Sequence, residues 1–362
     1  MRLFSTEAVS KYHPDKYADQ ISDAILTECL KQDRQSHCGI ETMVKGNTVV
    51  LGGEITSKAD INYDQIVRRV AKKLGYRADK IINLISEQSP EINRAVLSDE
   101  DIGAGDQGIM FGYATRETAS RLPYAFDVAN RIIAALEDDA DNNPDTFLKG
   151  DAKTQVTIDL DTGEIVTVVV SVCHKEGCDL DEVQHYVLAL VGDECICDDW
   201  IINPAGTWTV GGAEADCGLT GRKIVCDQYG GFCRVGGGAF SGKDPSKVDR
   251  TGAYMARYLA KNIVAAELAD RCEIELAYAI GLADPVSVMV DTFGTGRVSD
   301  EKIASWLMEH IDMRPGSITS RFELRRPIYR RVSCGGHFGE NAVGLPWEWT
   351  DIAEVLQKEI LS

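Results

Sequence analysis

The apolar residues in the first third of this chain follow two different periods. A spacing of three and four residues, which lines up side chains on one helical face, begins after Pro14, a residue favoured in a first helical turn. That stripe consists of Ala18, Ile21, Ala24 and Ile25, and a second one consists of Ile66, Val67, Val70 and Leu74. Between the stripes, residues 38–45 and 48–56 are rich in β-branched residues and meet at a Gly-Asn pair, which predicts paired strands. The apolar run 80–86 closes this unit.

The middle third repeats that order. A strand-like run at 108–115 precedes a helical stripe. The stripe consists of Ala125, Val128, Ile132 and Ala135. Residues 154–160 and 164–172 are joined by an Asp-Thr-Gly turn and predict a second strand pair. Asp179 and Glu182 resemble a capping box before another apolar helical face, and a short apolar run at 200–203 ends the unit.

The final third gives the same sequence of elements. It begins with a predicted strand at 223–227, followed by a helix from Pro245 to about Leu268 with Asp244 as its N-cap. Runs at 272–281 and 286–293 predict the strand pair. A last helix is predicted through Ile303, Trp306 and Leu307, with Ser299 as its cap.

Each third thus predicts a strand, a helix, two strands, a helix and a strand. This is the split β-α-β arrangement, so the predicted fold class is α/β (α+β) with three pseudo-repeated β-α-β-β-α-β domains. The expected boundaries are 1–91 for the amino-terminal domain, 102–208 for the central domain and 210–346 for the carboxyl-terminal domain. The repeat is one of pattern, because the three thirds share almost no sequence identity.

Charge and cysteine content exclude several classes of protein. The net charge is −19 and the pI is near 4.8, so the surface as a whole repels nucleic acids and anionic membranes. An anionic ligand must therefore meet a local concentration of Lys and Arg. No apolar stretch reaches the roughly 18 residues of a membrane span, and the first residues lack a secretory apolar run. The 11 cysteines form no C-x-x-C spacing and are expected to be reduced thiols of a cytoplasmic protein.

A glycine-rich stretch, GGGAFSGKDPSKVDR at 236–250, almost matches a phosphate-binding loop. Lys243 is in place, but Asp244 stands where such loops carry the Ser or Thr that holds Mg²⁺. Such a turn is often plain backbone geometry, yet the basic residues nearby and the helix that follows favour phosphate binding. Asp249, in the first turn of that helix, is either a surface carboxylate favoured by the helix dipole or a metal ligand.

Other short stretches also concentrate reactive side chains. His13 and Asp15 stand together at a predicted helix start, where they are either cap and surface residues or candidates for phosphate and Mg²⁺ contact. Glu54 lies in an apolar strand, where a carboxylate is costly without a partner. One polar loop carries Asp151 and Lys153, and a second carries Asp216, Arg222 and Lys223.

Together these stretches resemble one family. They read, in order, HPDK, GGEIT, QSPEIN, GAGDQGIMFGYAT, DAKTQVT, DCGLTGRKI and GGGAFSGKDPSKVDRTGAYMARYLAKNIVAA. Nearly the whole chain is similar to S-adenosylmethionine synthetases, also called methionine adenosyltransferases. The resemblance implies that ATP and L-methionine form S-adenosylmethionine, and that the expelled triphosphate is hydrolysed to diphosphate and phosphate. It also implies Mg²⁺ and K⁺ as cofactors, and a homodimer or homotetramer whose active sites are shared between subunits.

The resemblance implies a role for each matching residue. The catalytic positions are His13, Lys153, Arg222 and Lys243. The nucleotide-binding positions are Asp151, Ala152, Thr207, Trp208, Asp216, Lys223 and Ala239. The methionine-binding positions are Glu54, Gln88, Asp216 and Lys247. Asp15 and Asp249 match Mg²⁺ ligands, Glu41 matches the K⁺ site, and residues 88–102 resemble a lid.

The chain departs from the family pattern at a few positions. Lys11 and Tyr12 replace a usual Glu-Gly, Thr207 replaces an Arg, and Glu87 stands where Lys is common. Two alternatives therefore stay open beside the transferase. One is a hydrolase of nucleotides or polyphosphate that does not use methionine. The other is a catalytically weak or regulatory paralogue that acts through an active partner.

Overall fold

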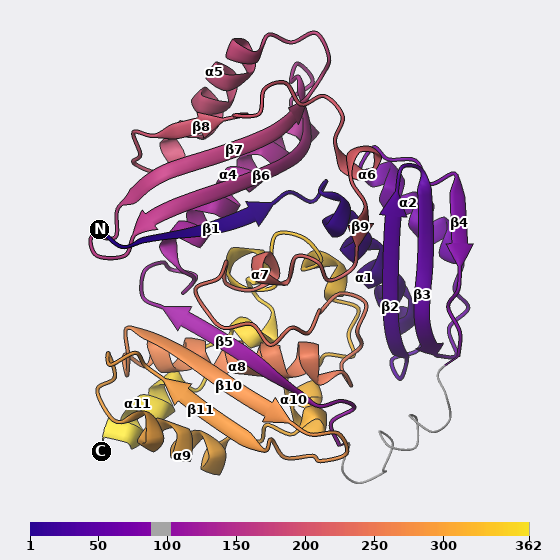
Figure 1. Cartoon of the computed structure of the whole chain (residues 1–362). Coiled ribbons are helices and arrows are strands. Elements are labelled where there is room, and N and C mark those ends of the chain that lie inside the picture. The colour runs from indigo at the N-terminus through magenta and orange to yellow at the C-terminus, as the bar shows by residue number, and fades with distance from the viewer. Residues whose placement is uncertain (88–102, 362) are drawn as a thin grey trace.

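The structure, a computed structural model, describes residues 1–87 and 103–361; Gln88 and the expected lid lie outside the described residues. Figure 1 shows three β-sheets, each covered by helices on one face. The predicted mixed α/β class is therefore confirmed. Within the described ranges, no helix combines the length and the apolar character that a bilayer crossing requires.

The amino-terminal sheet has the strand order β4-β3-β2-β9. Its strands are β2 (His37–Lys45), β3 (Thr48–Thr56), β4 (Lys80–Asn83) and β9 (Gly218–Leu219), and its helices are α1 (Pro14–Gln32) and α2 (Tyr63–Lys73). The predicted strand pair is confirmed, because β2 and β3 are antiparallel along their whole length. Gly46 makes their tight turn with a φ of 56°, which glycine adopts without strain.

The central sheet has the order β1-β6-β7-β8. Its strands are β1 (Leu3–Val9), β6 (Leu148–Asp159), β7 (Ile165–His174) and β8 (Trp200–Ile202), and its helices are α4 (Tyr124–Asn142), α5 (Leu180–Val191) and the 3₁₀ turn η1 (Gly192–Glu194). Asp179 caps α5 as predicted, because its side chain accepts hydrogen bonds from the backbone of Asp181 and Glu182. This domain has a hydrophobic core of its own, separate from the core that the other two sheets share.

The carboxyl-terminal sheet has the order β11-β10-β5. Its strands are β5 (Gly108–Thr115), β10 (Arg271–Tyr278) and β11 (Ser287–Asp291), and its helices are α8 (Val248–Ala265) and α9 (Asp300–His310). Ser299 caps α9 as predicted. The remaining elements are α6 (Gly212–Ala215), α7 (Ile224–Asp227), α10 (Pro315–Arg321), η2 (Tyr329–Arg331), η3 (Gly339–Ala342), η4 (Pro346–Glu348) and α11 (Ala353–Leu361).

Each sheet takes one strand from a different third of the sequence. β1 pairs with β6 of the central sheet, β5 pairs with β10 of the carboxyl-terminal sheet, and β9 pairs with β2 of the amino-terminal sheet. The thirds are therefore interlocked, and none of them builds its sheet from its own strands alone. The exchange also brings Ser10, before α1, against β6, and brings Gly221 and Lys223, after β9, against α1 (Figure 1).

Three predictions in the final third are wrong. Residues 223–227 form the short helix α7 instead of a strand, because β9, which ends at Leu219, already fills the edge of the sheet beside β2. The long helix begins at Val248 with Lys247 as its N-cap. Asp244 is not the cap, because its carboxylate accepts hydrogen bonds from the backbone of Cys38 (2.7 Å) and Ser246 (2.9 Å). After α9, the described chain continues in helices and turns without the predicted closing strand.

Candidate active site

His13 caps the amino end of α1. Its Nδ1 accepts a hydrogen bond from the backbone N–H of Asp15 at 3.1 Å, so in the neutral ring the proton lies on Nε2. Burial and the positive charges of Lys223 and Lys153 lower the pKa of His13 to about 4, against the opposing charges of Asp15 and Asp216. His13 is therefore a neutral hydrogen-bond donor at pH 7.

Asp15 joins this imidazole to the basic residues that follow β9. Its Oδ2 accepts a hydrogen bond from Lys223 Nζ at 2.6 Å, and its Oδ1 accepts one from the backbone of Leu219 at 2.9 Å. The guanidinium of Arg222 lies 3.8 Å from the same Oδ1. Burial opposes ionisation, but the hydrogen bonds from Lys223 and Leu219 hold the pKa of Asp15 below its usual value. The structure thus brings four predicted site residues together.

Strand β6 brings Asp151, Ala152 and Lys153 close to these residues. Lys153 lies opposite Val9 in the register of β1 and β6. Two hydrogen bonds join Ala152 to Ser10. The backbone N–H of Ser10 donates to the Ala152 carbonyl at 3.0 Å, and the Ala152 N–H donates to Ser10 Oγ at 3.1 Å. Since Ser10 lies three residues before the helix cap, these bonds set the distance between β6 and the imidazole. We call this group the His13 cluster: His13, Asp15, Lys153, Arg222 and Lys223.

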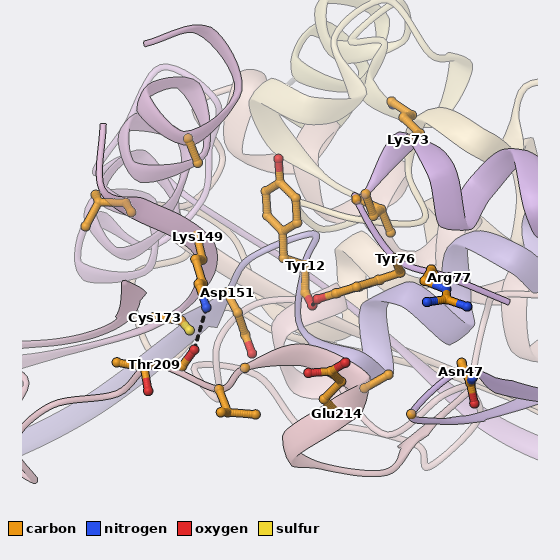
Figure 2. A pocket seen from close by; sticks show the side chains of 18 residues that line it. Tyr12, Asn47, Lys73, Tyr76, Arg77, Lys149, Asp151, Cys173, Thr209 and Glu214 are labelled. Carbon is orange, nitrogen blue, oxygen red and sulfur yellow. Dashed lines mark hydrogen bonds between the residues drawn. The ribbon is translucent and has the colours of Figure 1, made fainter. Parts of the chain in front are cut away.

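Asp151 is a buried carboxyl at the edge of the His13 cluster. Its Oδ2 accepts a hydrogen bond from the backbone N–H of Gly212 at 2.6 Å, whereas its Oδ1 has no hydrogen-bond partner among the described residues. Burial raises the pKa of Asp151 to about 6, although the Gly212 hydrogen bond and the Lys153 charge oppose the shift. Asp151 lines a cavity of about 730 Å³ together with Tyr12 and Tyr76. Figure 2 shows these three side chains around it.

Lys11 and Tyr12, which depart from the family pattern, are built into the fold. Lys11 Nζ lies 2.5 Å from Asp141 Oδ2, and the hydroxyl of Tyr12 donates to the other oxygen of that carboxylate. Tyr76 in turn donates from its hydroxyl to the carbonyl of Tyr12. These contacts tie the segment before His13 to α4 and leave the cap of α1 intact.

A second cluster surrounds Lys243. Its Nζ lies 2.5 Å from Asp249 Oδ2, and its backbone forms an isolated bridge with Gly39 of β2. The glycines of the loop are needed for close approach: a Cβ on Gly238 would lie 2.2 Å from Asp249 Oδ1. The loop is therefore folded tightly around this ion pair. We call the second group the Lys243 cluster: Glu41, Glu54, Lys243, Lys247 and Asp249.

The other members of the Lys243 cluster project from the neighbouring strands and from α8. Glu54 lies opposite Gly39 in the register of β2 and β3, so it and Lys243 flank the same residue. Desolvation raises the pKa of Glu41, and the charge of Lys243 opposes this shift. Lys247, at the start of α8, donates to the buried Asp244 carboxylate at 2.7 Å.

Ala239 and Asp216 both lie near the His13 cluster. The Cβ of Ala239 is 2.4 Å from the position that a Cβ on Gly221 would take, so the glycine loop packs on the turn before Arg222. The charge of Asp216 raises the pKa of both His13 and Asp151, which places its carboxylate near both groups.

Thr207 and Trp208 are not joined to either cluster by a hydrogen bond in the part of the chain that the structure describes. Trp208 is anchored at the end of β7, where its backbone N–H donates to His174 Nε2 at 3.1 Å. Its indole N–H donates to the carbonyl of Val210 at 2.7 Å. Thr207 is exposed. Gln88 lies outside the described residues.

Sequence reasoning missed a row of buried carboxylates on α1. Asp19 and Asp23 follow Asp15 at intervals of four residues, which places all three on one side of the helix. Asp19 pairs with Lys16 at 2.8 Å, and Asp23 pairs with Arg250 at 2.7 Å. The signal was present, because carboxylates at helical spacing within an apolar stripe require buried partners.

Comparison with known proteins gives one consistent result. Residues 1–96, 101–208 and 210–349 match the models of the N-terminal, central and C-terminal domains of S-adenosylmethionine synthetase. A solved structure of an unusual S-adenosylmethionine synthetase from Campylobacter jejuni is 37% identical, with a TM-score of 0.92 over 99% of this chain and 100% of that chain. The chain belongs to the S-adenosylmethionine synthetase family.

The predicted metal ligands of this S-adenosylmethionine synthetase family member fit a cation that is shared with phosphate. Within residues 1–87 and 103–361, no three His, Cys, Asp or Glu side chains gather as a closed metal site. Mg²⁺ commonly binds through one or two carboxylates, with substrate phosphates completing its shell. Asp15 and Asp249 each hold a lysine ammonium against one oxygen, at 2.6 and 2.5 Å, so each carboxylate is already placed to bind positive charge.

Proposed function

We propose that this chain is a methionine adenosyltransferase. It joins ATP and L-methionine to form S-adenosylmethionine, and it hydrolyses the released triphosphate to diphosphate and phosphate. The observation that carries this proposal is the His13 cluster, in which Lys153 and Lys223 act on a neutral histidine and Arg222 and Lys223 lie beside the adjoining Asp15. Family membership supplies the reaction class, a transfer of an adenosyl group.

The proposed reaction needs no general base. A lone pair of the methionine sulfur forms the S–C5′ bond, the C5′–O bond breaks, and the triphosphate leaves with the electron pair. The barrier lies in the negative charge that builds up on the leaving oxygen. A positive charge at 4 Å contributes about 4 kcal/mol at an effective dielectric constant of about 20, so several fixed cations supply a large part of the rate enhancement.

Each residue of the His13 cluster has a role in this scheme. His13 donates its Nε2–H to the leaving oxygen without giving up the proton, since its pKa of about 4 keeps the imidazole neutral at pH 7. Lys153, Arg222 and Lys223 bind the phosphates. Asp151, Ala152, Thr207, Trp208, Asp216 and Ala239 surround the nucleoside.

The family generally depends on Mg²⁺ and K⁺, and we assign these ions to the carboxylates. Asp15 and Asp249 would hold Mg²⁺, and Glu41 would hold K⁺ near Lys243. The ions would neutralise charge on the polyphosphate.

We infer that each active site combines the His13 cluster of one chain with the Lys243 cluster of another. On α1, Asp15 contacts the region of the His13 cluster, and Asp23 contacts the loop of the Lys243 cluster. The two residues are eight positions apart, a rise of about 12 Å along the helix, so the two clusters of one chain meet α1 at separate points. In this arrangement Glu54, Gln88 and Lys247 bind methionine, with Asp216, and Lys243 meets the triphosphate across the subunit contact. The assembly is a homodimer or a homotetramer built from such dimers.

We also propose a cytoplasmic location. All 11 cysteines of the chain are free thiols in the structure, as is usual in a reducing compartment.

The proposal is tested by incubating the purified chain with ATP, L-methionine, Mg²⁺ and K⁺. Mass spectrometry should detect the sulfonium product, and phosphate and diphosphate should appear in equal amounts. Product formation by the chain alone would exclude a regulatory paralogue. Phosphate release at the same rate without methionine would favour the hydrolase instead.

A further inference from the structure

Asp23 of α1 and Arg250 of α8 form a fully buried, two-pronged ion pair. Arg250 Nη1 lies 2.7 Å from Asp23 Oδ1, and Arg250 Nη2 lies 2.8 Å from Asp23 Oδ2. The relative exposures of the side chains are 1% and 0%. Two parallel hydrogen bonds fix both the distance and the orientation of the partners.

This pair also holds the backbone of the glycine loop. Asp23 Oδ1 accepts the N–H of Gly242 at 2.9 Å. Arg250 Nη1 donates to the carbonyls of Phe240 at 3.0 Å and of Lys243 at 3.2 Å. Three backbone groups within four consecutive residues are thus bound by one ion pair, and the last of them belongs to Lys243 itself.

The loop has little room to move away from this pair. Gly242 has a φ of 82°, and a Cβ at this position would lie 2.1 Å from the carbonyl oxygen of Ile40. The N–H of Ile40 donates to the carbonyl of Gly242 at 3.2 Å. The guanidinium is itself fixed from behind, because it lies 4.1 Å from the ring centroid of Tyr329 and donates to the hydroxyl of Tyr254 at 2.9 Å.

We propose that Asp23 and Arg250 are positioning residues that set the place of the Lys243 ammonium. The inference rests on the proposed function of Lys243 in binding the triphosphate. A buried ion pair usually stabilises a fold no better than well-packed apolar side chains do. Here the pair binds backbone groups of the loop that carries the functional lysine, which an apolar pair could not do. A displacement of about 1 Å in such a group lowers turnover by about 100-fold.

The test compares Asp23→Asn with a matched control, Glu348→Gln. Glu348 forms a similar buried pair with Arg257, with two contacts of 3.0 Å, and Arg257 lies on the same helix as Arg250. Arg257 binds the carbonyls of Tyr113, Ser120 and Arg121 and none of the glycine loop. Both variants remove one buried negative charge, so both should lower the melting temperature.

Three measurements separate positioning from stability. Relative to Glu348→Gln, Asp23→Asn should speed hydrogen exchange in the peptide that contains Gly242. It should also weaken the binding of inorganic triphosphate with Mg²⁺ at least tenfold, and lower kcat at least tenfold while KM for methionine stays within about twofold. If Asp23→Asn does not fold, Arg250→Lys replaces it in the test. Lysine keeps the positive charge but cannot form the two parallel hydrogen bonds to Asp23, so the same effects are expected.

The outcomes distinguish the two proposals. Equal exchange, triphosphate affinity and kcat in the two folded variants would overturn the positioning role. The exchange and triphosphate measurements do not require turnover, so they test the positioning of the loop even if the wild-type chain forms no sulfonium product. Absence of the sulfonium product would overturn the proposed function but not the positioning role.

Discussion

Lys223 Nζ lies 2.6 Å from Asp15 Oδ2, although the two residues are 208 positions apart in the sequence. The strand exchange makes this contact possible, because β9 carries the chain to the edge of β2 beside the amino end of α1. The same ammonium lowers the pKa of His13, and its carboxylate partner raises that pKa. Burial lowers this pKa most, and an ion pair that belongs to the candidate site adjusts it further.

The pKa of His13 should change when either Lys223 or Asp15 is replaced. In the wild-type protein, NMR of labelled histidine should give His13 a pKa of about 4. Lys223→Met removes a charge that lowers the value, so the pKa should rise. Asp15→Asn removes a charge that raises it, so the pKa should fall. Shifts in the same direction for both variants would contradict the described geometry.

Asp151 should make stability depend on pH in a defined window. Its folded pKa of about 6 is above the ordinary 3.8, so between pH 4 and 6 the folded protein keeps a proton that the unfolded chain has lost. The stabilising contribution of Asp151 is therefore lost as pH rises through that window, by roughly 3 kcal/mol in total.

Asp151→Asn tests this dependence. The amide keeps an acceptor for the Gly212 N–H but does not titrate. In urea unfolding, the stability of the variant relative to wild type should rise between pH 4 and 6 and then stay constant. A difference that is the same at pH 4 and pH 7 would show that Asp151 ionises as it does in water.

Gly238→Ala should disturb the proposed metal ligand. The added Cβ would lie 2.2 Å from Asp249 Oδ1, so the carboxylate must move. We expect the Mg²⁺ concentration for half-maximal activity to rise at least tenfold, measured by titrating Mg²⁺ at saturating ATP. Gly192→Ala is the control, since its nearest contact would be an ordinary 3.5 Å. Equal Mg²⁺ requirements in both variants would remove Asp249 from the metal site.

Local patterns in the sequence were enough to predict most helices and strand pairs. Pro14 starts α1, Asp179 caps α5 and Ser299 caps α9, all as predicted, because these signals act over a few residues. The motif around residues 236–250 singled out Lys243 and Asp249 as candidates for phosphate and metal binding, and the structure places the two side chains in one ion pair.

The long-range features could not be read from local patterns. The exchange of β1, β5 and β9 between sheets depends on which edges are free in three dimensions. Residues 223–227 looked like a strand because they are apolar and short, yet no sheet edge was left for them. The buried partner of Asp23 is also invisible locally, because Arg250 is 227 residues away, whereas the partner of Asp19 is the nearby Lys16.

The division of the candidate site between two chains gives the sharpest prediction. Lys223→Ala damages the His13 cluster, and Lys243→Ala damages the Lys243 cluster. Each variant alone should lose turnover by about 100-fold or more, because each removes a cation from the leaving group. Both should keep their fold, since both side chains are partly exposed rather than part of the core.

Mixing the two variants distinguishes a shared site from one within a single chain. If every site combines the His13 cluster of one chain with the Lys243 cluster of another, a hybrid dimer has one intact site and one doubly damaged site. Random re-pairing of equal amounts makes half of the dimers hybrid, so activity should recover to about a quarter of wild type. If both clusters served one site in the same chain, every site in the mixture would carry a lesion. Activity would then stay at the level of the separate variants, and the two-chain site would be wrong.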